Sequence, residues 1–246
     1  MSRSRILVTG AAGKVGQAIA PLLRDRFSLR LLDRRRIRPA DDDEVIRADI
    51  RRSRALARAC RDVAAVVHLA AIPREEDFAS RLLPMNILGT YRVFEAARLA
   101  GVPRVVFAST VRTVFGYPLS QPVTASMPVR PISLYACTKV FGEALARYYA
   151  DVHGMSVICL RIGSFAAEPR RRSSVGERVR WCSPADLAQL VVRGIESDVR
   201  FGIFHAVSGI PGNNLDIEEA REVLGFDPND RIEDHPPLSP EPGVSR

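Results

Sequence analysis

Lysine is almost absent from the sequence: only two of its 36 basic residues, Lys14 and Lys139, are lysines. The four cysteines are far apart and form no C-x-x-C pair, which argues against a disulfide framework and against a metal site. No apolar run approaches the roughly 18 residues that would span a bilayer, so a membrane protein is excluded. A strand-like run, Ile6–Val8, follows Met1 too closely for a signal peptide, and we therefore expect a cytoplasmic protein.

The composition that is present is that of a globular protein, with 46% hydrophobic and 26% charged residues in 246. The formal charge of +8 could attract either nucleic acid or a small anion. No nucleic-acid recognition module accompanies the arginines, so we expect a small-molecule substrate and no nucleic-acid partner. Because arginine is the default cation of this chain, each of the two lysines calls for a specific reason.

Short β-like runs alternate with helical patterns, which predicts an α/β fold with a doubly wound parallel sheet, the Rossmann arrangement. The predicted strands are Ile6–Thr9, Ser28–Leu32, Val45–Arg47, Ala65–Leu69, Arg104–Ala108, Ser156–Leu160 and Gly202–Val207. The predicted helices are Gly13–Arg24, Ser53–Cys60, Met85–Ala100, Leu134–His153, Pro184–Ile195 and Asp216–Leu224. We expect one NAD(P)-binding domain over residues 1–226, with a small C-terminal substrate-binding portion over 162–226. A proline-rich tail over 227–246 is expected to be disordered.

A glycine-rich segment, Thr9–Gly16, follows the first strand and opens the first helix. Gly10 suits a tight turn, Gly13 lets the backbone approach a pyrophosphate, and Gly16 allows the helix to pack closely on the strand. The amides of the helix start, including those of Lys14 and Val15, are available to the anion. An ordinary glycine-rich turn is the alternative, but the order of strand, glycines and helix favours a dinucleotide loop.

Further candidate cofactor residues stand at the ends of the next strands. Asp33 can accept hydrogen bonds from the adenosine ribose and repel a 2′-phosphate, which favours NAD. NADP is the alternative, because Arg34 and its neighbours Arg35 and Arg36 could instead bind that phosphate. These arginines could also be ordinary surface charges in contact with solvent. The pair Asp49 and Ile50 could meet the adenine edge, or Asp49 could be a plain turn residue. Small and apolar residues after His68 permit close approach of the cofactor: Leu69, Ala70 and Ala71.

Tyr135 and Lys139 lie four residues apart at the start of a predicted helix and therefore project from one face. A neighbouring ammonium lowers the pKa of a phenol and lets it exchange protons with an alcohol or carbonyl. The compact ammonium can also reach two ribose hydroxyls, which explains a lysine in this arginine-rich chain. Ser109 and Thr110 close the fifth strand, where either hydroxyl could orient a substrate oxygen or simply form a strand-end turn.

With these motifs in this order, the sequence resembles the extended, epimerase-like branch of the short-chain dehydrogenase/reductase superfamily over about Ile6–Ile195. It is most similar to the uronate dehydrogenases, through residues 106–109, 134–147 and 161–169. The resemblance implies that Tyr135 is the acid/base, that Lys139 is its partner and a ribose ligand, and that Thr110 is the catalytic hydroxyl. It also implies a cofactor contact at Ile162, a substrate contact at Ser164 and a homodimer formed through the helices at 85–100 and 134–153.

One segment departs from the family pattern. Uronate dehydrogenases have Ser-Asn-His where this chain has Thr110-Val111-Arg112. In that family a substrate-carboxylate arginine follows, in a region where this chain has Arg170–Arg172 and a short insertion. We expect Arg112, and an arginine of that cluster, to meet a compact polar or acidic substrate. The alternative is that these arginines point to solvent and the pocket is mainly apolar.

The resulting hypothesis is an NAD(P)-dependent enzyme that transfers hydride between the nicotinamide and a small polar hydroxy or carbonyl compound, such as a sugar acid. Two alternatives stay open. A nucleotide-sugar epimerase or reductase would use the same cofactor, although such enzymes usually have a longer C-terminal lobe. A non-catalytic dinucleotide sensor would typically lack the Tyr/Lys pair.

Overall fold

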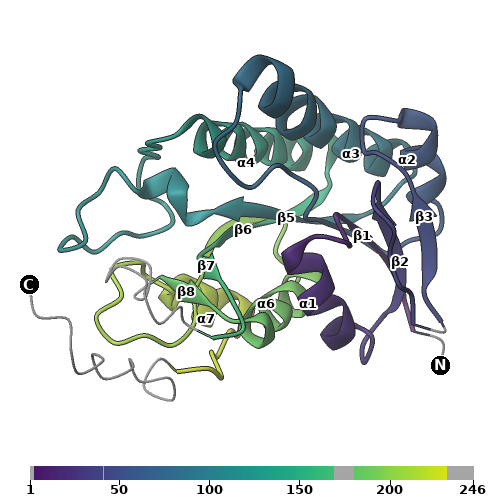
Figure 1. Ribbon diagram of the computed structural model, residues 1–246. Helices are drawn as coiled ribbons and strands as arrows, with labels where there is room; N and C mark the ends of the chain where they lie inside the picture. The colour runs from purple at the N-terminus through teal and green to yellow at the C-terminus, as the bar shows by residue number, and fades with distance from the viewer. Residues whose placement is uncertain (1–2, 41, 169–179, 232–246) are drawn as a thin grey trace, which may run out of the picture.

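The structure, a computed structural model, describes residues 3–40, 42–168 and 180–231 (Figure 1). Its centre is a seven-stranded parallel sheet in the order β3-β2-β1-β4-β5-β6-β9. The strands are β1 (Arg5–Thr9), β2 (Ser28–Asp33), β3 (Glu44–Arg47), β4 (Ala65–His68), β5 (Arg104–Thr110), β6 (Ser156–Ile162) and β9 (Phe201–Ala206). The order reverses between β1 and β4, so the crevice at the carboxyl ends of these two strands is where a ligand is expected.

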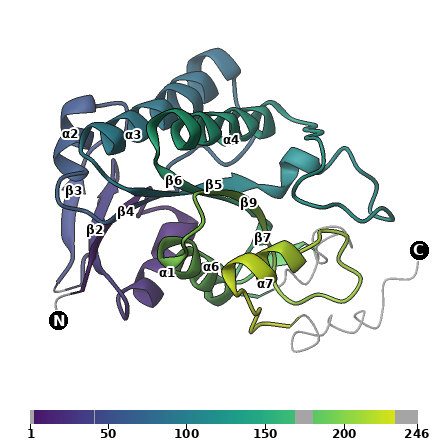
Figure 2. The same ribbon diagram turned by 180° about the vertical axis from the view of Figure 1, so that it is seen from behind.

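Helices cover both faces of the sheet (Figures 1 and 2). One face carries α2 (Ser53–Ala59), α3 (Leu88–Leu99) and α4 (Leu134–His153), and the other carries α1 (Lys14–Leu23), α6 (Pro184–Glu196) and α7 (Glu218–Leu224). Each layer encloses its own apolar core, because alternate side chains of a strand point to opposite faces. The predicted α/β doubly wound fold is therefore confirmed.

A π-helix, η1 (Phe78–Ile87), precedes α3 and was not predicted. The apolar spacing predicted a single helix over Met85–Ala100. In the structure Asp77 accepts hydrogen bonds from the backbone and hydroxyl of Ser80, and this cap begins the helix two turns earlier. The segment 70–77 before it is thereby held at the edge of the β1/β4 crevice.

Strands β5 and β6 are each two residues longer than predicted, and they pair through Thr110 and Ile162. A 3₁₀ turn, η2 (Val111–Val114), follows β5, and a small two-stranded sheet pairs β7 (Ser164–Phe165) with β8 (Trp181–Cys182). The loops around Val123 and Leu215 join through a single bridge and enclose a third, smaller apolar cluster. These pieces form a wall beyond the carboxyl ends of β5 and β6.

The first part of the predicted disordered tail is ordered in the structure. Gln189 exchanges two 2.8 Å hydrogen bonds with the backbone of Asp227, and the amide of Asn229 donates to Asp186 at 2.7 Å. These bonds attach Asp227 and Asn229 to α6, and the tail from residue 232 lies outside the described residues. None of the helices in the described ranges has both the length and the apolar character needed to cross a membrane.

Candidate active site

The glycine-rich loop forms a tight connection between β1 and α1. Gly10 has φ +74°, a left-handed conformation that favours glycine, and a Cβ there would lie 2.6 Å from the backbone nitrogen of Ala70. A Cβ on Gly16 would lie 2.6 Å from the carbonyl oxygen of Gly10, so the helix can approach the loop only with glycine here. Gly13 is the N-cap of α1, and no side chain of the described residues caps that helix start. The positive end of α1 therefore faces the loop, where it favours a phosphate group.

Two adjoining cavities, of about 420 and 360 Å³, meet at this loop and share six wall residues: Gly10, Gly13, Lys14, Leu69, Ala71 and Pro73. We call them together the cleft. The first cavity, the reaction cavity, is also lined by Val15, Gly16, Ser109, Thr110, Arg112, Tyr135, Lys139, Ile162 and Ser164. The second, the adenosine cavity, contains Asp33, Arg34, Asp49, Ile50 and Ala70. The residues expected to touch cofactor or substrate are thus brought to one continuous cleft.

In the adenosine cavity the carboxylate of Asp33 is 6% exposed and stands at the end of β2. It accepts hydrogen bonds from the backbone amides of Ala12 at 3.0 Å and Arg35 at 2.9 Å. The guanidinium of Arg35 pairs with the same carboxylate at 3.3 Å. It is therefore already engaged with an acid at the place where a 2′-phosphate would need it. Asp49 pairs with Arg51 at 2.9 Å, and this pairing is the main reason that its pKa lies below the usual value.

In the reaction cavity Tyr135 is 7% exposed, and burial raises its pKa to about 12. The positive charge of Arg112, whose Cζ lies 6.0 Å from the Tyr135 ring centroid, and a hydrogen bond with Thr110 both act to lower the pKa. The expectation that Lys139 brings the phenol pKa down is therefore not met in the structure without cofactor, because desolvation dominates. The nearby cation that acts to lower the pKa of Tyr135 here is Arg112.

Lys139 is 4% exposed and donates to the carbonyl oxygen of Ala108 at 2.8 Å. Burial lowers its pKa to about 8, although the negative charge of Glu143 one turn later opposes this shift. The ammonium lies 4.9 Å from the Phe107 ring centroid, which supports a buried cation without neutralising it. His68 is 1% exposed and hydrogen-bonded to Thr9 and Thr90, so it is a packed core imidazole.

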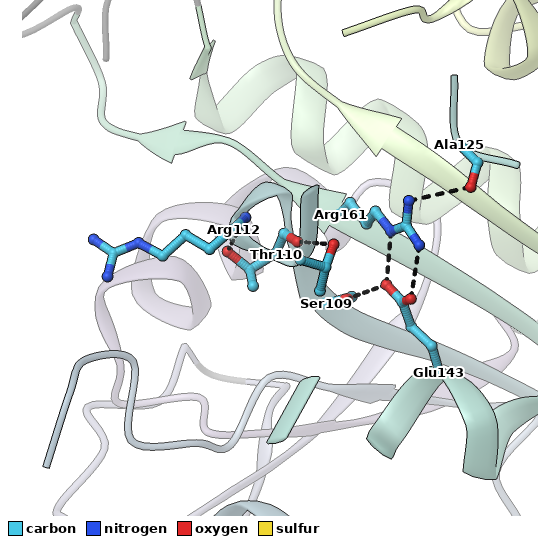
Figure 3. Close-up of polar contacts among 7 residues, drawn as sticks. Ser109, Thr110, Arg112, Ala125, Glu143 and Arg161 are labelled. Atoms are coloured by element: carbon cyan, nitrogen blue, oxygen red, sulfur yellow. Dashed lines mark hydrogen bonds and ion pairs between the residues drawn. The ribbon is translucent and has the colours of Figure 1, made fainter. Parts of the chain in front are cut away.

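Ser109 lines the reaction cavity and takes part in a buried hydrogen-bond network (Figure 3). Its hydroxyl donates to Glu143 Oε1 at 2.6 Å, and Arg161 holds the same carboxylate with two hydrogen bonds of 2.9 Å. A third nitrogen of Arg161 donates to the carbonyl oxygen of Ala125 at 3.1 Å. The hydroxyl of Ser109 donates to Glu143 and the residue also lines the reaction cavity next to Thr110, so its contact with a substrate stays a prediction. Of the two strand-end hydroxyls, Thr110 is the one beside Tyr135.

Arg112 and Ser164 line the reaction cavity, as expected for substrate residues, and Figure 3 shows the Arg112 side chain directed away from the Glu143–Arg161 pair. Lys14, expected at the cofactor, is exposed at the loop and donates to the carbonyl oxygen of Phe165 in β7. The cluster Arg170–Arg172, expected to supply a substrate arginine, lies outside the described residues.

Sequence reasoning missed several residues that build the site. The carboxylate of Glu75 accepts from the amides of Leu134 and Tyr135, each at 3.1 Å, and so holds the start of the helix that carries Tyr135. Asn86 ties the same 70–77 segment to α4 through Ile72 and Thr138. Arg180 lines the reaction cavity from the residue before β8. Glu75 contacts a helix that starts 59 residues later, and nothing in the sequence around Glu75 indicates that contact.

The residues present fit a dinucleotide cofactor. The positive φ of Gly10, the uncapped start of α1 and the buried carboxylate at the end of β2 provide the turn, the anion site and the ribose acceptor in one cleft. Lys139 and Tyr135 stand at the far end of that cleft. Fold and site together define an α/β enzyme of the short-chain dehydrogenase type, with the extended, epimerase-like glycine pattern.

Comparison with known proteins gives the same result. The model of the "NAD dependent epimerase/dehydratase family" matches residues 6–183, and the chain belongs to that family. A curated relative from Haloferax volcanii, an NAD-dependent glucose-6-phosphate dehydrogenase, is 34% identical over 92% of this chain and 93% of its own. An L-arabinose 1-dehydrogenase (NAD(P)+) from the same organism is 35% identical over 92% and 97%. The crystal structure of uronate dehydrogenase from Agrobacterium tumefaciens superimposes with a TM-score of 0.88 and 32% identity, covering 98% of this chain and 93% of that one. The expected resemblance is confirmed.

Proposed function

We propose that the protein is an NAD-dependent dehydrogenase that oxidises a small sugar or sugar acid at its hemiacetal carbon. The observation that carries this proposal is the placement of Thr110, Tyr135 and Lys139 in one cavity continuous with the dinucleotide loop. Relatives named as glucose-6-phosphate and arabinose dehydrogenases, and a structural neighbour that is a uronate dehydrogenase, support this substrate class.

In this mechanism Thr110 and Tyr135 hold the substrate hydroxyl, and the Tyr135 oxygen accepts its proton. The bound nicotinamide supplies the hydride acceptor. Tyr135 acts as the base in its phenolate form and becomes the neutral phenol when it accepts the proton, and Lys139, fixed by Ala108, presents its ammonium to the ribose and to that phenolate. Arg112 adds a second positive charge beside Tyr135 and so helps to bring down a phenol pKa that burial has raised. The main-chain amides at the start of α1 hold the diphosphate.

The test is an assay of the protein with glucose, arabinose, glucuronate and glucose 6-phosphate, with NAD and with NADP, followed by the absorbance of the reduced cofactor. Net reduction of the cofactor by at least one sugar is expected. Interconversion of nucleotide sugars without net reduction would instead establish an epimerase. Binding of the cofactor without turnover of any compound would establish a dinucleotide sensor.

We further propose that NAD binds more tightly than NADP. The buried carboxylate of Asp33 stands where the adenosine ribose is held, and it would repel a 2′-phosphate that lies next to it. Arg35 is already paired with Asp33, at 3.3 Å. Dissociation constants measured by calorimetry are expected to favour NAD by about tenfold or more, which is roughly 1.4 kcal/mol. In Asp33→Ser this preference is expected to shrink, and tighter binding of NADP to the unmodified protein would refute the assignment.

A homodimer formed through α3 and α4 is also proposed. These two helices lie on one face of the molecule and expose large apolar side chains: Leu88, Tyr91, Leu99, Leu134, Tyr148 and Val152. Exposed apolar area of this kind favours association with a second copy. Size-exclusion chromatography with light scattering tests this proposal, and a mass twice that of the chain is expected.

A cytoplasmic location stays a prediction, to be checked by cell fractionation.

A further inference from the structure

A buried ion pair lies one helical turn from Lys139. Arg161 donates two hydrogen bonds of 2.9 Å to the carboxylate of Glu143, and the two side chains are only 2% and 5% exposed (Figure 3). Taking two charges out of water is costly, and a buried pair contributes little net stability compared with apolar side chains of similar size. Stability alone therefore does not account for charges at this place, and the groups on which they act become informative.

One face of α4 carries Tyr135, Lys139 and Glu143, each one turn after the last. All three side chains are buried. The ammonium of Lys139 donates to the carbonyl oxygen of Ala108 at 2.8 Å, and Glu143 accepts from the hydroxyl of Ser109 at 2.6 Å. Two successive turns of the helix thus hold two successive residues of β5, directly before the threonine that ends this strand.

The close approach of α4 to β5 depends on a glycine between these contacts. A Cβ on Gly142 would lie 2.2 Å from Cζ of the Phe107 ring, so no other residue fits there without a shift. The same ring lies 4.9 Å from the ammonium of Lys139. Glu143 and Lys139 are therefore held in a fixed relation to each other and to the strand end by packing and by hydrogen bonds.

The charges in the reaction cavity oppose an ammonium at Lys139. The described lining contains no Asp or Glu and four basic residues: Lys14 on α1, Arg112 in η2, Lys139 on α4 and Arg180 before β8. Neighbouring positive charges and burial both disfavour a charged amine. An ammonium in this position therefore needs a negative charge from outside the cavity lining.

Glu143 provides that charge. Among the described residues it is the one whose charge acts to raise the pKa of Lys139, which burial lowers to about 8. The other titratable groups packed nearby are neutral: burial lowers the pKa of His68 at the end of β4 to about 3, raises that of Tyr135 to about 12 and raises that of the Cys159 thiol on β6. Glu143 is thus the counter-charge of Lys139 in this part of the structure.

We propose that Glu143 is a positioning residue of the dehydrogenase reaction: its buried charge keeps the side chain of Lys139 an ammonium at the end of β5, where it binds the ribose and acts on Tyr135. The proposal rests on the proposed function, in which Lys139 has those two tasks. Glu143 is not among the described residues that line the reaction cavity, so it acts through Lys139 and not on the substrate.

The low number of lysines makes the charge of Lys139 directly measurable. In protein labelled with ¹³C-lysine, nuclear magnetic resonance gives one side-chain Cε signal for Lys139 and one for Lys14, and each signal shifts when its amine loses a proton. In the wild type the Lys139 midpoint is expected at about pH 8. In the double variant Glu143→Gln/Arg161→Gln it is expected about one pH unit lower, because the negative charge is lost. The Lys14 midpoint is expected to stay unchanged.

Both members of the pair are changed because Glu143→Gln alone would leave a buried guanidinium without its partner. The two amides can still form hydrogen bonds with each other and with the hydroxyl of Ser109. The conservative variant Glu143→Asp keeps the charge, and its Lys139 midpoint is expected to stay near the wild-type value.

The matched control is Arg26→Gln/Glu196→Gln. This pair, at 2.6 Å, is exposed and lies near the amino ends of the strands, at the opposite edge of the sheet from the cleft. The same chemical change there is expected to leave the Lys139 midpoint and the binding of NAD unaltered.

NAD binding gives a second measurement that needs no turnover. At pH 6 Lys139 is charged in both proteins, so calorimetric dissociation constants of the wild type and of the double variant are expected to agree. At pH 8 the double variant is expected to bind NAD about fivefold more weakly, because a smaller fraction of its Lys139 is charged. A merely structural role of Glu143 would weaken binding equally at both pH values.

Equal Lys139 midpoints in the wild type and the double variant would overturn the proposal, as would a loss of NAD affinity that does not depend on pH. If the double variant does not fold, the wild type decides: a Lys139 midpoint below about pH 7 would show that the ammonium is not held. The expected shifts of midpoint and NAD affinity in a protein that oxidises no sugar would retain the action of Glu143 on Lys139 and refute the dehydrogenase function.

Discussion

At the scale of single residues, Tyr135 supports the sharpest prediction. The change Tyr135→Phe removes only the phenolic hydroxyl from a buried ring, so packing and the cofactor cleft are kept. Turnover is expected to fall by between about 100-fold and 10,000-fold, the usual contribution of a general acid/base. The dissociation constant of NAD is expected to change little. Steady-state kinetics and a cofactor titration check both, and near-wild-type turnover would refute the role assigned to Tyr135.

Lys139 supports a second prediction of this kind. Its side chain is buried, and its ammonium donates to Ala108 within a space that holds a single compact cation. In Lys139→Arg the planar guanidinium cannot reproduce that contact and still reach the ribose, so both NAD binding and kcat are expected to decrease. The matched control is Lys14→Arg, because Lys14 is exposed and arginine there keeps the charge near the diphosphate. Equal effects of the two substitutions would contradict this assignment.

Motif residues such as Gly10, Tyr135 and Lys139 could be located from the sequence because each follows a strand or begins a helix at a fixed spacing. Ser109 and Arg180 could not be interpreted in the same way. Ser109 precedes Thr110 at the end of β5, and only the buried pair Glu143–Arg161 shows that the Ser109 hydroxyl donates to Glu143. Arg180 is one of many arginines, and its place in the cavity wall depends on Phe115 and Asn214, which are distant in sequence. Contacts between distant segments leave no local pattern.

At the scale of helices and strands, Glu75 connects the 70–77 segment to α4. Its carboxylate accepts the amides of Leu134 and Tyr135 at the positive end of the helix. The change Glu75→Ala is expected to lower the free energy of unfolding by about 1 kcal/mol, as for loss of a helix cap. It is also expected to lower kcat, because the backbone of Tyr135 loses an anchor. Urea denaturation and kinetics measure the two effects.

The neighbouring acid provides the control for this prediction. Glu76 pairs with the exposed Arg74 at 2.7 Å and makes no contact with α4 among the described interactions. Surface pairs of this kind contribute little to stability, so Glu76→Ala is expected to leave unfolding and kcat near the wild-type values. If both variants lose the same stability and the same kcat, the effect belongs to the 70–77 segment as a whole and not to the cap that Glu75 forms on α4.

The regular elements were predicted well where the apolar period is strong, as in the seven sheet strands and in α4. The failures have physical causes. The π-helix η1 contains Pro84, which interrupts any helical pattern that requires a donor at every position. The strands β7 and β8 have two residues each, too short to show a period, and they are held by pairing across a long separation in sequence. Both missed features border the cleft.

At the scale of the whole molecule, two buried histidines make stability depend on pH. His68 and His205 are each 1% exposed, and burial lowers their pKa values to about 3 and about 4. Both are neutral in the folded protein at pH 5, whereas in the unfolded chain they bind protons below their ordinary pKa of 6.5. The unfolded state therefore takes up more protons, and stability that is fully present above pH 6.5 is lost as the pH falls.

The expected loss between pH 6.5 and pH 5 is up to about 1.4 kcal/mol per pH unit for each histidine. Thermal melting at several pH values measures it. His205→Asn replaces one titrating ring with a neutral side chain that can still hydrogen-bond, and it is expected to remove about half of the slope at lower absolute stability. Identical melting temperatures at pH 7 and pH 5 would contradict the assignment of the buried rings.

The scarcity of lysine has a practical consequence for studying this protein. The only two side-chain amines in the sequence both line the reaction cavity: Lys14 is exposed at the dinucleotide loop and Lys139 is buried near the ribose position. Arginines elsewhere do not react with acylating reagents such as succinimidyl esters at neutral pH. Acylation of Lys14, followed by peptide mass spectrometry, therefore reports directly on cleft occupancy, and saturating NAD is expected to suppress it. Because arginine replaces lysine at almost every basic position, an amine-reactive label has one accessible side-chain target, Lys14, and that target lies in the cofactor cleft.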